Sequence, residues 1–531
     1  MRQTSLQIWM FTVGLGAMGC SGSSETPLLP GAGGNQVSSG GGQAMTGGAA
    51  NSGGKSGLGG IATGGSVNAG GSFNTGGVVA TGGASSTGGK ANAGGAATGG
   101  NATGGNGKGG ASQGGSVNSG GATATGGATA TGGATATGGA TATGGSVSTG
   151  GSSGAQHWVG TWTASPYVDT NTSNTPPIAL SNAVVRQVTH VSLGGSQLRV
   201  QFSNLHGNGP LTITAAHIAL CKATPAVDST IDTATDKALA FSGTAAVTIA
   251  AGKEVWSDAV DFTVPNRGNV TITTAFGSVP STLTQHTGSR TTSYFQSAST
   301  SVNSASMATA QTKDLWFFIS GIDVMADASA RGVVAIGDSI TDGRGTDTNN
   351  NNRWTDILAA RLLANAATAN VSMMNQGIGA TNLVGTSATA GQARFARDVL
   401  GASGVKYVIV YHGVNDIGGG ASFASMKTAY DDMISRAHAK SLLVYGGTIL
   451  PFGANSYYSA AHESVRQQVN TYIKSGAFDG YIDFDAALTD GGSPPKLATT
   501  YATWAQTDGL HPGPVGYQKM GDTVTLSLFA N

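Results

Sequence analysis

Residues 333–342 read VVAIGDSITD, an apolar run that breaks at Gly337 and presents Ser339 on the turn that follows. A short apolar run bounded by glycine is typical of a buried strand. A serine on the turn after such a strand is one of the few short patterns with a catalytic mechanism attached to it. The same residues also fit an ordinary strand-to-loop turn, so the interpretation depends on partners elsewhere in the chain.

The partners stand late in the sequence, where residues 508–511 read DGLH in a segment rich in glycine and proline. Asp508 precedes His511 by three residues. A serine, an aspartate and a histidine in this chain order can form the triad of an acyl-transfer enzyme. The nucleophile elbow of α/β-hydrolases has glycine two residues after the serine. Thr341 stands at that position here, which argues against the α/β-hydrolase fold.

The sequence after Arg331 alternates between strand-like and helix-like segments. Apolar strands that alternate with amphipathic helices form a parallel sheet covered on both faces, which predicts an α/β fold. The predicted strands cover residues 333–336, 371–374, 405–411, 442–445 and 481–484, and the predicted helices cover residues 354–362, 426–437 and 463–473.

Several candidate site residues follow these predicted strands, and ligands of such sheets bind at the carboxyl ends of the strands. Ser339 follows the first strand, residues 375–380 (NQGIGA) follow the second, and Asn415 follows the third. The backbone N–H groups of Ser339 and Ala380, with the side-chain amide of Asn415, can supply three donors to a tetrahedral oxyanion. Gly413 allows the chain to turn close to the site.

Residues 156–328 contain many short runs in which apolar and polar residues alternate, among them residues 198–202, 211–214, 246–249 and 270–273. Helical periodicity is nearly absent, and Gly, Pro and Asn separate the runs. This pattern predicts an all-β sandwich. Residues 188–193 lead into the first of these runs across Gly194-Gly195, which is interpreted as a turn between strands.

The chain contains 87 glycines, and the excess over an ordinary composition is concentrated in residues 21–155. Gly-Gly doublets there are spaced by Ala, Thr, Ser and Asn, and the hexad ATATGG occurs four times in residues 122–145. Such a segment buries too little to offset the entropic cost of ordering its backbone, so we expect a flexible linker. A glycine-rich solenoid is the alternative, although its repeats lack the apolar residues that stacking would bury.

Residues 1–20 are predicted to be an export signal. Arg2 precedes an apolar stretch, residues 8–18, that is too short to span a bilayer, and small residues precede Cys20. This resembles a bacterial lipoprotein signal, in which Cys20 becomes lipidated; an ordinary cleaved signal peptide is the alternative. Cys221 is the only other cysteine, so with Cys20 lipidated no internal disulfide can form.

Charge and motif spacing argue against several other classes of protein. The formal net charge is zero and the basic residues are scattered, so nucleic acid is not an expected partner. No cofactor and no metal are expected. His462-Glu463 begins like a zinc motif, but Arg466 stands where the second histidine is needed. Residues 347–352 loosely resemble a calcium loop but lack its glycine and final glutamate.

Three further polar residues stand beside the predicted site. Asp342 and Asp416 are interpreted as turn-stabilising groups rather than catalysts. His412 is expected either to touch the substrate or to lie on the rim of the site.

Taken together, these segments resemble the SGNH, or GDSL-type, hydrolase family. Its four sequence blocks are matched in order by residues 337–339, 375–380, 413–416 and 508–511. The resemblance implies a three-layer α/β/α parallel sheet in residues 329–531 and a serine esterase activity. Residues 337–345, and the WVGTW stretch at residues 158–162, are similar to a subgroup of bacterial secreted arylesterases and acylhydrolases associated with xylan degradation.

The resemblance also implies roles for individual residues. Ser339 is implied to be the nucleophile, His511 the general base and then acid, and Asp508 the group that orients the imidazole. Asp338 and Gly413 are implied to support them.

One position departs from the family pattern. Where the family usually has the glycine whose N–H serves the oxyanion hole, this chain has Ala380. Alanine preserves the donor if its conformation is right-handed. If glycine is needed for close approach, the hole is weaker or the donor shifts to Gly379.

These observations predict an exported serine esterase for short-chain, chiefly acetyl, esters, with acetylated polysaccharide as the expected substrate. Residues 342–353 and 418–422 are polar or small and contain no apolar wall for a long acyl chain. A lipase or lysophospholipase is one alternative, and a non-catalytic carbohydrate-binding surface lipoprotein is another. The expected order is signal peptide (1–20), linker (21–155), β-sandwich (156–328) and catalytic domain (329–531), anchored to the cell envelope or surface through a lipid on Cys20.

Overall fold

The computed structural model describes residues 155–222, 228–297, 299–502 and 508–530. The predicted signal peptide, Cys20 and the predicted linker up to residue 154 lie outside this range. All described residues fall within one compact unit, residues 140–531. Among them, no helix combines the length and the apolar character that crossing a membrane requires.

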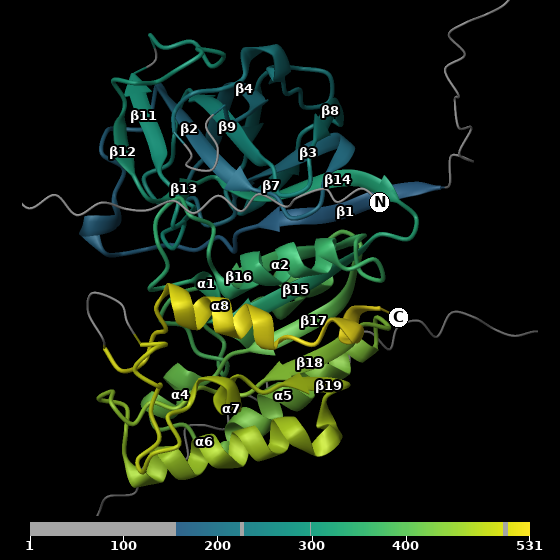
Figure 1. The fold of residues 1–531 in the computed structure, drawn as a ribbon. Coiled ribbons are helices and arrows are strands. Elements are labelled where there is room, and N and C mark those ends of the chain that lie inside the picture. The colour runs from purple at the N-terminus through teal and green to yellow at the C-terminus, as the bar shows by residue number, and fades with distance from the viewer. Residues whose placement is uncertain (1–154, 223–227, 298, 503–507, 531) are drawn as a thin grey trace, which may run out of the picture. The chain divides into compact units, whose positions relative to one another are not determined.

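The second half of the described chain is built around a parallel sheet of five strands in the order β16-β15-β17-β18-β19 (Figure 1). The strands are β15 (Arg331–Gly337), β16 (Val371–Gly377), β17 (Val405–Tyr411), β18 (Leu443–Gly447) and β19 (Gly480–Ile482). The helices are α1 (Ser339–Asp342), α2 (Trp354–Ala364), α3 (Gly391–Phe395), α4 (Val414–Gly418), α5 (Phe423–His438), α6 (Ala460–Tyr472), α7 (Phe484–Leu488) and α8 (Pro514–Thr523). Two π-helical turns, η5 (Ala396–Leu400) and η6 (Ile473–Ala477), and the 3-10 turn η7 (Leu526–Phe529) complete this half.

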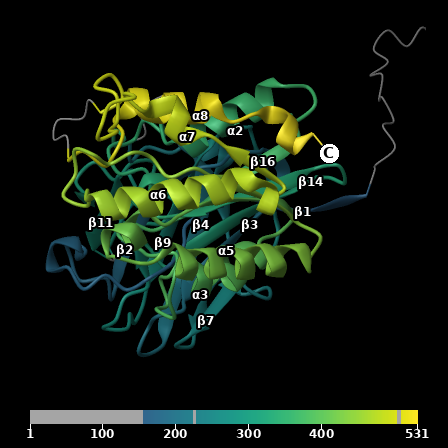
Figure 2. The same ribbon diagram turned by 90° about the horizontal axis from the view of Figure 1, so that it is seen from below.

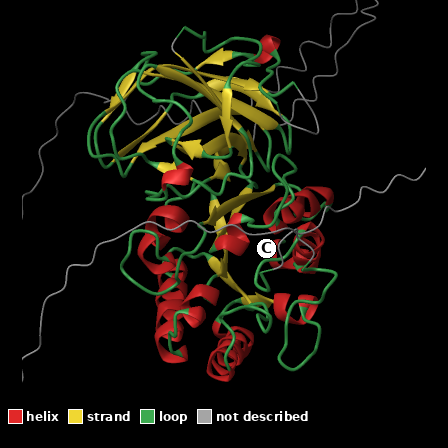
Figure 3. Cartoon of the chain, turned by 90° about the vertical axis from the view of Figure 1, so that its left-hand side faces the viewer, coloured by secondary structure: helices red, strands yellow, loops and turns green. Residues whose placement is uncertain are grey.

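Helices lie on both sides of the parallel sheet (Figure 3). Helices α2, α7 and α8 gather on one side, and α3 and α5 on the other (Figure 2). Residues 333–336 are completely buried, as expected for a strand covered on both faces. Trp354 of α2 packs edge-on against Tyr411 and Phe484. The predicted parallel α/β arrangement is confirmed, and each predicted strand and helix is present to within a few residues.

The residues before β15 form a β-rich region with two main antiparallel sheets. One sheet contains β1 (Gln156–Thr163), β14 (Ile319–Asp327), β3 (Gly195–Asn204), β7 (Lys253–Trp256) and β8 (Val260–Val264). The other contains β12 (Gln311–Lys313), β11 (Ser293–Ser297), β2 (Ala183–His190), β9 (Asn269–Phe276), β4 (Leu211–Leu220), β5 (Lys237–Ala238) and β6 (Val247–Ile249). The short strands β10 (Gln285–His286) and β13 (Trp316–Phe317) pair with each other, and η3 (Thr172–Asn174) and η4 (Thr233–Thr235) are 3-10 turns.

Both main sheets contribute to one hydrophobic cluster. Val200 and Phe202 of β3, Ile213 of β4 and Ile272 of β9 are fully buried in it. The alternation of apolar and polar residues in the sequence therefore reflects strands with one buried face.

The segment Gly194-Gly195 has a different role from the one predicted. β2 and β3 belong to different sheets, so the chain crosses between sheets here instead of forming a turn between paired strands. A side chain on Gly194 would overlap the backbone of Val264, and this close approach explains the glycine.

The β-rich region packs on the parallel sheet beside β16. The Ser372 hydroxyl in β16 donates to the carbonyl of Gly160 in β1 (2.6 Å), and the Gly160 N–H donates to the Ser403 carbonyl (2.9 Å). The Met373 N–H donates to the Ser192 hydroxyl (2.9 Å). Strand β1, which pairs with β14 in its own sheet, thus covers the edge strand of the other half.

The strand order leaves β15 between β16 and β17, so the connection from β15 to β16 and the connection from β16 to β17 run in opposite directions across the sheet. Such a reversal opens a crevice at the carboxyl ends of the strands. The segments that follow β15, β16 and β17 meet at this edge, and they include Ser339, Ala380 and Asn415.

Candidate active site

Ser339 is the first residue of α1, directly after β15. The carboxylate of Asp338 accepts a hydrogen bond from the Ile340 N–H (3.0 Å) and so caps this short helix. A side chain on Gly337 would overlap the Tyr411 carbonyl, so glycine is needed where the strand ends. The Ser339 residue is 5% exposed. The strand, cap and helix together hold its hydroxyl in one place at the edge of the sheet.

Ser339 and His511 lie 172 residues apart in sequence, yet Ser339 Oγ is 2.7 Å from His511 Nε2. His511 Nδ1 lies 2.6 Å from Asp508 Oδ2. The other carboxylate oxygen accepts the backbone N–H groups of Leu510 (3.0 Å) and His511 (2.9 Å). Because an ionised carboxylate only accepts, the ring proton belongs on Nδ1, and Nε2 is then able to accept the serine proton.

The electrostatics of this pair suit a base and its orienting group. Burial lowers the pKa of His511 below its ordinary value; Asp508 opposes this, while the charges of Arg344 and Arg290 add to it. Burial by itself raises the pKa of Asp508, but the hydrogen bonds and charge of His511 outweigh it and hold that pKa below its usual range. At neutral pH the imidazole is therefore neutral and the carboxylate ionised.

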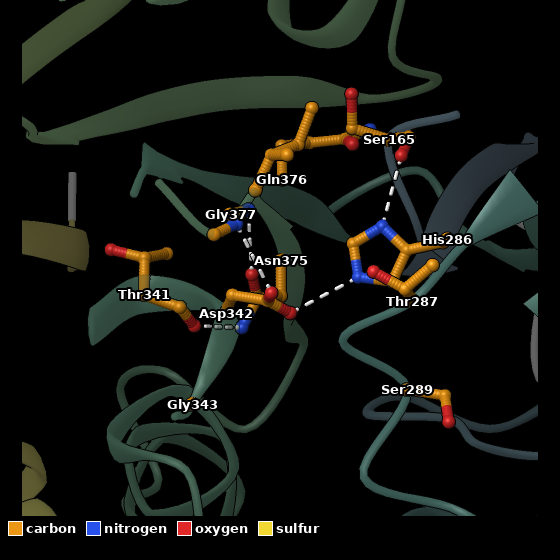
Figure 4. A network of polar contacts seen from close by, with 12 residues as sticks. Ser165, His286, Thr287, Ser289, Thr341, Asp342, Gly343, Asn375, Gln376 and Gly377 are labelled. Atoms are coloured by element: carbon orange, nitrogen blue, oxygen red, sulfur yellow. Dashed lines mark hydrogen bonds and ion pairs between the residues drawn. The ribbon is translucent and has the colours of Figure 1, made fainter. Parts of the chain in front are cut away.

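The turn after β16 is anchored by the side chain of Asn375 (Figure 4). Its amide donates to the Thr341 carbonyl (2.6 Å) and to the Thr355 hydroxyl (2.9 Å). Its oxygen accepts the Gly377 N–H (2.8 Å). The turn that carries Ala380 is thereby tied to α1, the helix that carries Ser339.

Ala380 has a φ of +59°, in the left-handed region. The right-handed conformation, in which alanine would serve as a donor without strain, is not the one observed. Alanine adopts the left-handed region at a cost of about 1–2 kcal/mol, whereas glycine adopts it freely. Gly379 is a poor substitute as donor, because its N–H already donates to Asp342 Oδ2 (3.2 Å).

Gly413, two residues before Asn415, has a φ of +131°, a conformation that favours glycine. The Asn415 amide donates to the Thr381 carbonyl (2.9 Å), and its oxygen accepts from the Tyr457 hydroxyl (3.1 Å). These two contacts fix which way the amide points. Since the amide nitrogen has two protons and Thr381 takes one, the second is available to a ligand.

Two buried carboxyl groups lie behind the site. Burial, with the charge of Asp416, raises the pKa of Asp338 to about 7, against the hydrogen bonds from Ile340 and Gly413. Burial also raises the pKa of Asp416, which accepts the Leu383 N–H (2.7 Å). The geometry of Asp416 agrees with its interpretation as a turn-stabilising group.

His412 is not a rim residue, because only 2% of it is exposed. Its Nε2 lies 3.3 Å from the Thr381 hydroxyl. Burial and the nearby charge of Arg394 lower the pKa of His412 well below its ordinary value, so the ring is neutral. The alternative that His412 lies on the rim of the site is therefore wrong.

Arg394 is a buried cation that stabilises the backbone at the site. The sequence does not predict this role. Its guanidinium donates to the carbonyls of Gly337 (2.8 Å) and Gln376 (2.6 Å), at the ends of β15 and β16. Asp398 pairs with it at 2.9 Å and in turn accepts from the Ser165 hydroxyl (2.6 Å). An isolated arginine carries no sequence signal for such a role.

Metal ligands were not expected from the sequence. Within the described part of the chain, no group of three or more His, Cys, Asp or Glu side chains is arranged to hold a metal ion. Cys221 is buried beside Val188.

Residues 335–519 match the model of the GDSL-like lipase/acylhydrolase family. A comparison with curated proteins gives no match. Among solved structures, a G-D-S-L family protein from Desulfitobacterium hafniense DCB-2 is 21% identical, with a TM-score of 0.29, over 36% of this chain and 96% of its own. For a GDSL-like lipase from Bacteroides thetaiotaomicron VPI-5482 the values are 19%, 0.28, 36% and 85%. For a variant of the acetyl xylan esterase Axe2 from Geobacillus stearothermophilus they are 18%, 0.28, 37% and 93%.

The family match covers most of the parallel sheet and the residues at its carboxyl edge, including Ser339, Asn415 and His511. Residues 335–519 belong to the GDSL-like lipase/acylhydrolase family. The protein is a carboxylic ester hydrolase.

Proposed function

We propose that the protein is a serine esterase in which Ser339 is the nucleophile, His511 the general base and acid, and Asp508 the orienting carboxylate. The observation that carries the proposal is the continuous hydrogen-bonded chain from Asp508 through His511 to Ser339, with distances of 2.6 and 2.7 Å. Nε2 takes the hydroxyl proton as Oγ attacks the ester carbonyl, and returns it to the leaving alcohol. Water then releases the acyl group with the same base.

The proposed oxyanion hole consists of the N–H groups of Ser339 and Ala380 and the side-chain amide of Asn415. The available amide proton of Asn415 supports this assignment. Asp338 and Gly413 support the hole indirectly, the first by capping α1 and the second by allowing the turn before Asn415. Donors fixed before the reaction stabilise the developing charge without reorganisation.

The test is hydrolysis of p-nitrophenyl acetate by purified variants. Ser339→Ala and His511→Ala are expected to lower kcat by several orders of magnitude, and Asn415→Ala by roughly 10²–10³. Ser435→Ala, on the exposed surface of α5, is the matched control and is expected to retain the full rate. Near-normal rates in the first three variants would overturn the assignment and favour the non-catalytic, carbohydrate-binding alternative.

For the substrate, we propose short acyl esters, chiefly acetyl groups on a polysaccharide. Support comes from the loops beside the site: residues 347–350 are polar and mostly exposed, and Gly419 and Gly420 are exposed. Long acyl chains need extended apolar walls, and each buried methylene contributes about 0.8 kcal/mol to selectivity. Residues 503–507, next to Asp508, lie outside the described part of the chain.

The chain-length proposal is tested with acetyl, butyryl and dodecanoyl esters and with acetylated xylan. We expect the highest kcat/KM for the acetyl ester and measurable release of acetate from the polysaccharide. A preference for the dodecanoyl ester, without acetate release from any polysaccharide, would favour a lipase or lysophospholipase.

We also propose that the protein is exported and anchored by a lipid on Cys20, with residues 156–328 as a β-sandwich domain before the catalytic domain at 329–531. The signal-like residues 1–20 support the anchor, and the shared core of the two antiparallel sheets supports the sandwich. Cys20→Ser is expected to move the protein from the membrane fraction to the soluble fraction at unchanged specific activity. A variant that remains with the membranes would refute the anchor.

A further inference from the structure

His286, in strand β10 of the β-rich region, reaches the catalytic half of the molecule (Figure 4). Its Nε2 lies 3.0 Å from Asp342 Oδ1, and its Nδ1 lies 2.9 Å from the carbonyl oxygen of Ser165. Only 4% of His286 and 5% of Asp342 are exposed. The contact is therefore a buried bridge between the two halves of the described chain.

The chemistry of the two partners determines which hydrogen bonds the ring can make. A backbone carbonyl accepts hydrogen bonds and cannot donate them. Burial by itself raises the pKa of Asp342, but the charge and hydrogen bond of His286, with Arg290 and Arg353 nearby, hold that pKa below its usual range, so this group is an ionised carboxylate. Both partners of the ring are therefore hydrogen-bond acceptors.

Two aromatic rings pack against His286. Tyr167 packs edge-on against it at 5.9 Å between ring centres, and Trp316 lies at 5.8 Å on a tilted plane. Trp316 is itself fixed, because its indole N–H donates to the Val188 carbonyl (3.0 Å). The imidazole therefore has one position, set by the β-rich region.

Asp342 links His286 to the candidate active site. It is the last residue of α1, the helix that begins with Ser339, and its second oxygen accepts the Gly379 N–H (3.2 Å). Gly379 directly precedes Ala380, the strained residue whose N–H we assign to the oxyanion hole. A side chain on Gly288 of the β-rich region would overlap the Asp342 carboxylate, so that region is shaped to admit it.

We propose that His286 is a positioning residue for catalysis: it holds the Asp342 carboxylate, and through it the Gly379-Ala380 turn, in the geometry that the oxyanion requires. The β-rich region thereby completes the catalytic machinery through this residue. The inference rests on the proposed esterase function and adds a residue outside the range matched by the family model, 335–519.

Two amide substitutions separate the two hydrogen bonds of the ring. The amide nitrogen of glutamine lies near the position of Nε2, so His286→Gln retains a donor to Asp342. The amide nitrogen of asparagine lies near the position of Nδ1, so His286→Asn retains the donor to the Ser165 carbonyl and loses the one to Asp342. Both substitutions leave a neutral amide side chain, which makes them a matched pair.

We expect His286→Asn to lower kcat for p-nitrophenyl acetate by about 10–100-fold with KM changed less than twofold, since the ground-state ester does not require the hole. Affinity for phenylboronic acid, which forms a tetrahedral adduct on serine, should fall in parallel. His286→Gln should recover most of the lost kcat. His217→Gln, which loses the Nδ1 contact to Asp236 elsewhere in the β-rich region, is the control and should behave as wild type.

Three outcomes would overturn the inference while leaving the esterase assignment intact: wild-type kcat in His286→Asn, equal losses in the Gln and Asn variants, or a loss confined to KM with unchanged boronate affinity. Absence of Ser339-dependent hydrolysis in the wild type would instead overturn the proposed function, and the inference with it. If thermal unfolding shows that His286→Asn does not fold, Asp342→Asn and Asp342→Ala replace it. Asparagine keeps an acceptor for Gly379, so equal kcat in these two variants would also refute the inference.

Discussion

At the scale of single residues, the site depends on protons held at defined atoms. The Asp508 carboxylate accepts hydrogen bonds from two backbone N–H groups and from the imidazole, and the last of these bonds holds the proton on Nδ1 of His511. Nε2 is left facing the Ser339 hydroxyl. The arrangement differs from a chance contact because every polar atom in it has a partner that fixes its role.

The first prediction at this scale concerns pH. The base must be neutral to accept a proton, and burial lowers the pKa of His511, so kcat/KM should fall on acidification with a midpoint below 6.5. Asp508 acts in the opposite direction on that pKa. Asp508→Asn should therefore move the midpoint to lower pH and reduce kcat by roughly 10³–10⁴. The pH profile of both proteins checks this, and a midpoint above 7 would contradict His511 as the base.

The second prediction concerns the strained alanine. Ala380→Gly relieves about 1–2 kcal/mol of backbone strain and adds about 0.4–1 kcal/mol of entropy to the unfolded chain, so the free energy of unfolding should rise slightly or stay constant. Ala439→Gly, at an exposed right-handed position, should lower it. Urea unfolding measures both. An equal loss in the two variants would show that Ala380 is unstrained.

At the scale of elements, the site depends on how closely the segments after three neighbouring strands approach one another. Gly377, at the end of β16, touches the backbone of α1 where the helix reaches Asp342. Asn375 reinforces the same contact by donating to the Thr341 carbonyl. Helix α1, which carries Ser339, and the end of β16, which leads to Ala380, are thus in direct backbone contact.

This contact predicts different costs for two neighbouring glycines. A side chain on Gly377 would overlap the Asp342 nitrogen, so Gly377→Ala should destabilise the fold by about 1–3 kcal/mol. A side chain on Gly379 would meet its nearest atom, Asp342 Oδ2, at 3.6 Å, so Gly379→Ala should cost less than about 1 kcal/mol. Denaturant unfolding of both variants provides the measurement. Equal costs would mean that the crossing of α1 and β16 is looser than described.

At the scale of the described unit, hydrogen bonds and a common buried cluster join the β-rich region to the parallel-sheet half. Strand β1 exchanges hydrogen bonds with β16 and with the Ser403 backbone. Val159 and Leu193 lie in one buried cluster against which Leu363 of α2 packs. Ser165 reaches the site twice, through His286 and through Asp398.

Such sharing predicts one cooperative unfolding transition for residues 156–531. Neither half keeps its edge covered without the other, so the loss of one exposes apolar surface of the second. Calorimetry should give equal calorimetric and van't Hoff enthalpies. Two separated transitions, or a stable and fully active protein after deletion of residues 1–328, would contradict the shared structure and the role assigned to His286.

Sequence by itself determined the parallel α/β fold and most of the candidate site. Buried parallel strands must be apolar on both faces, so the strands beginning near residues 333, 371 and 405 are visible as short apolar runs. Ser339, Asn415, Asp508 and His511 could be singled out as candidates because each stands in a short pattern at a strand end or in a turn, and such local patterns can be recognised in the sequence alone.

Only the tertiary structure decided the rest. The pairing of His286 with Asp342 joins residues 56 apart across two halves of the unit, and neither residue has a local pattern that announces the other. The left-handed conformation of Ala380, the burial of His412 and the support from Arg394 likewise arise from how the segments pack. A hydrogen bond or a φ angle imposed by a distant neighbour leaves no periodicity in the chain, because nothing about it repeats along the sequence.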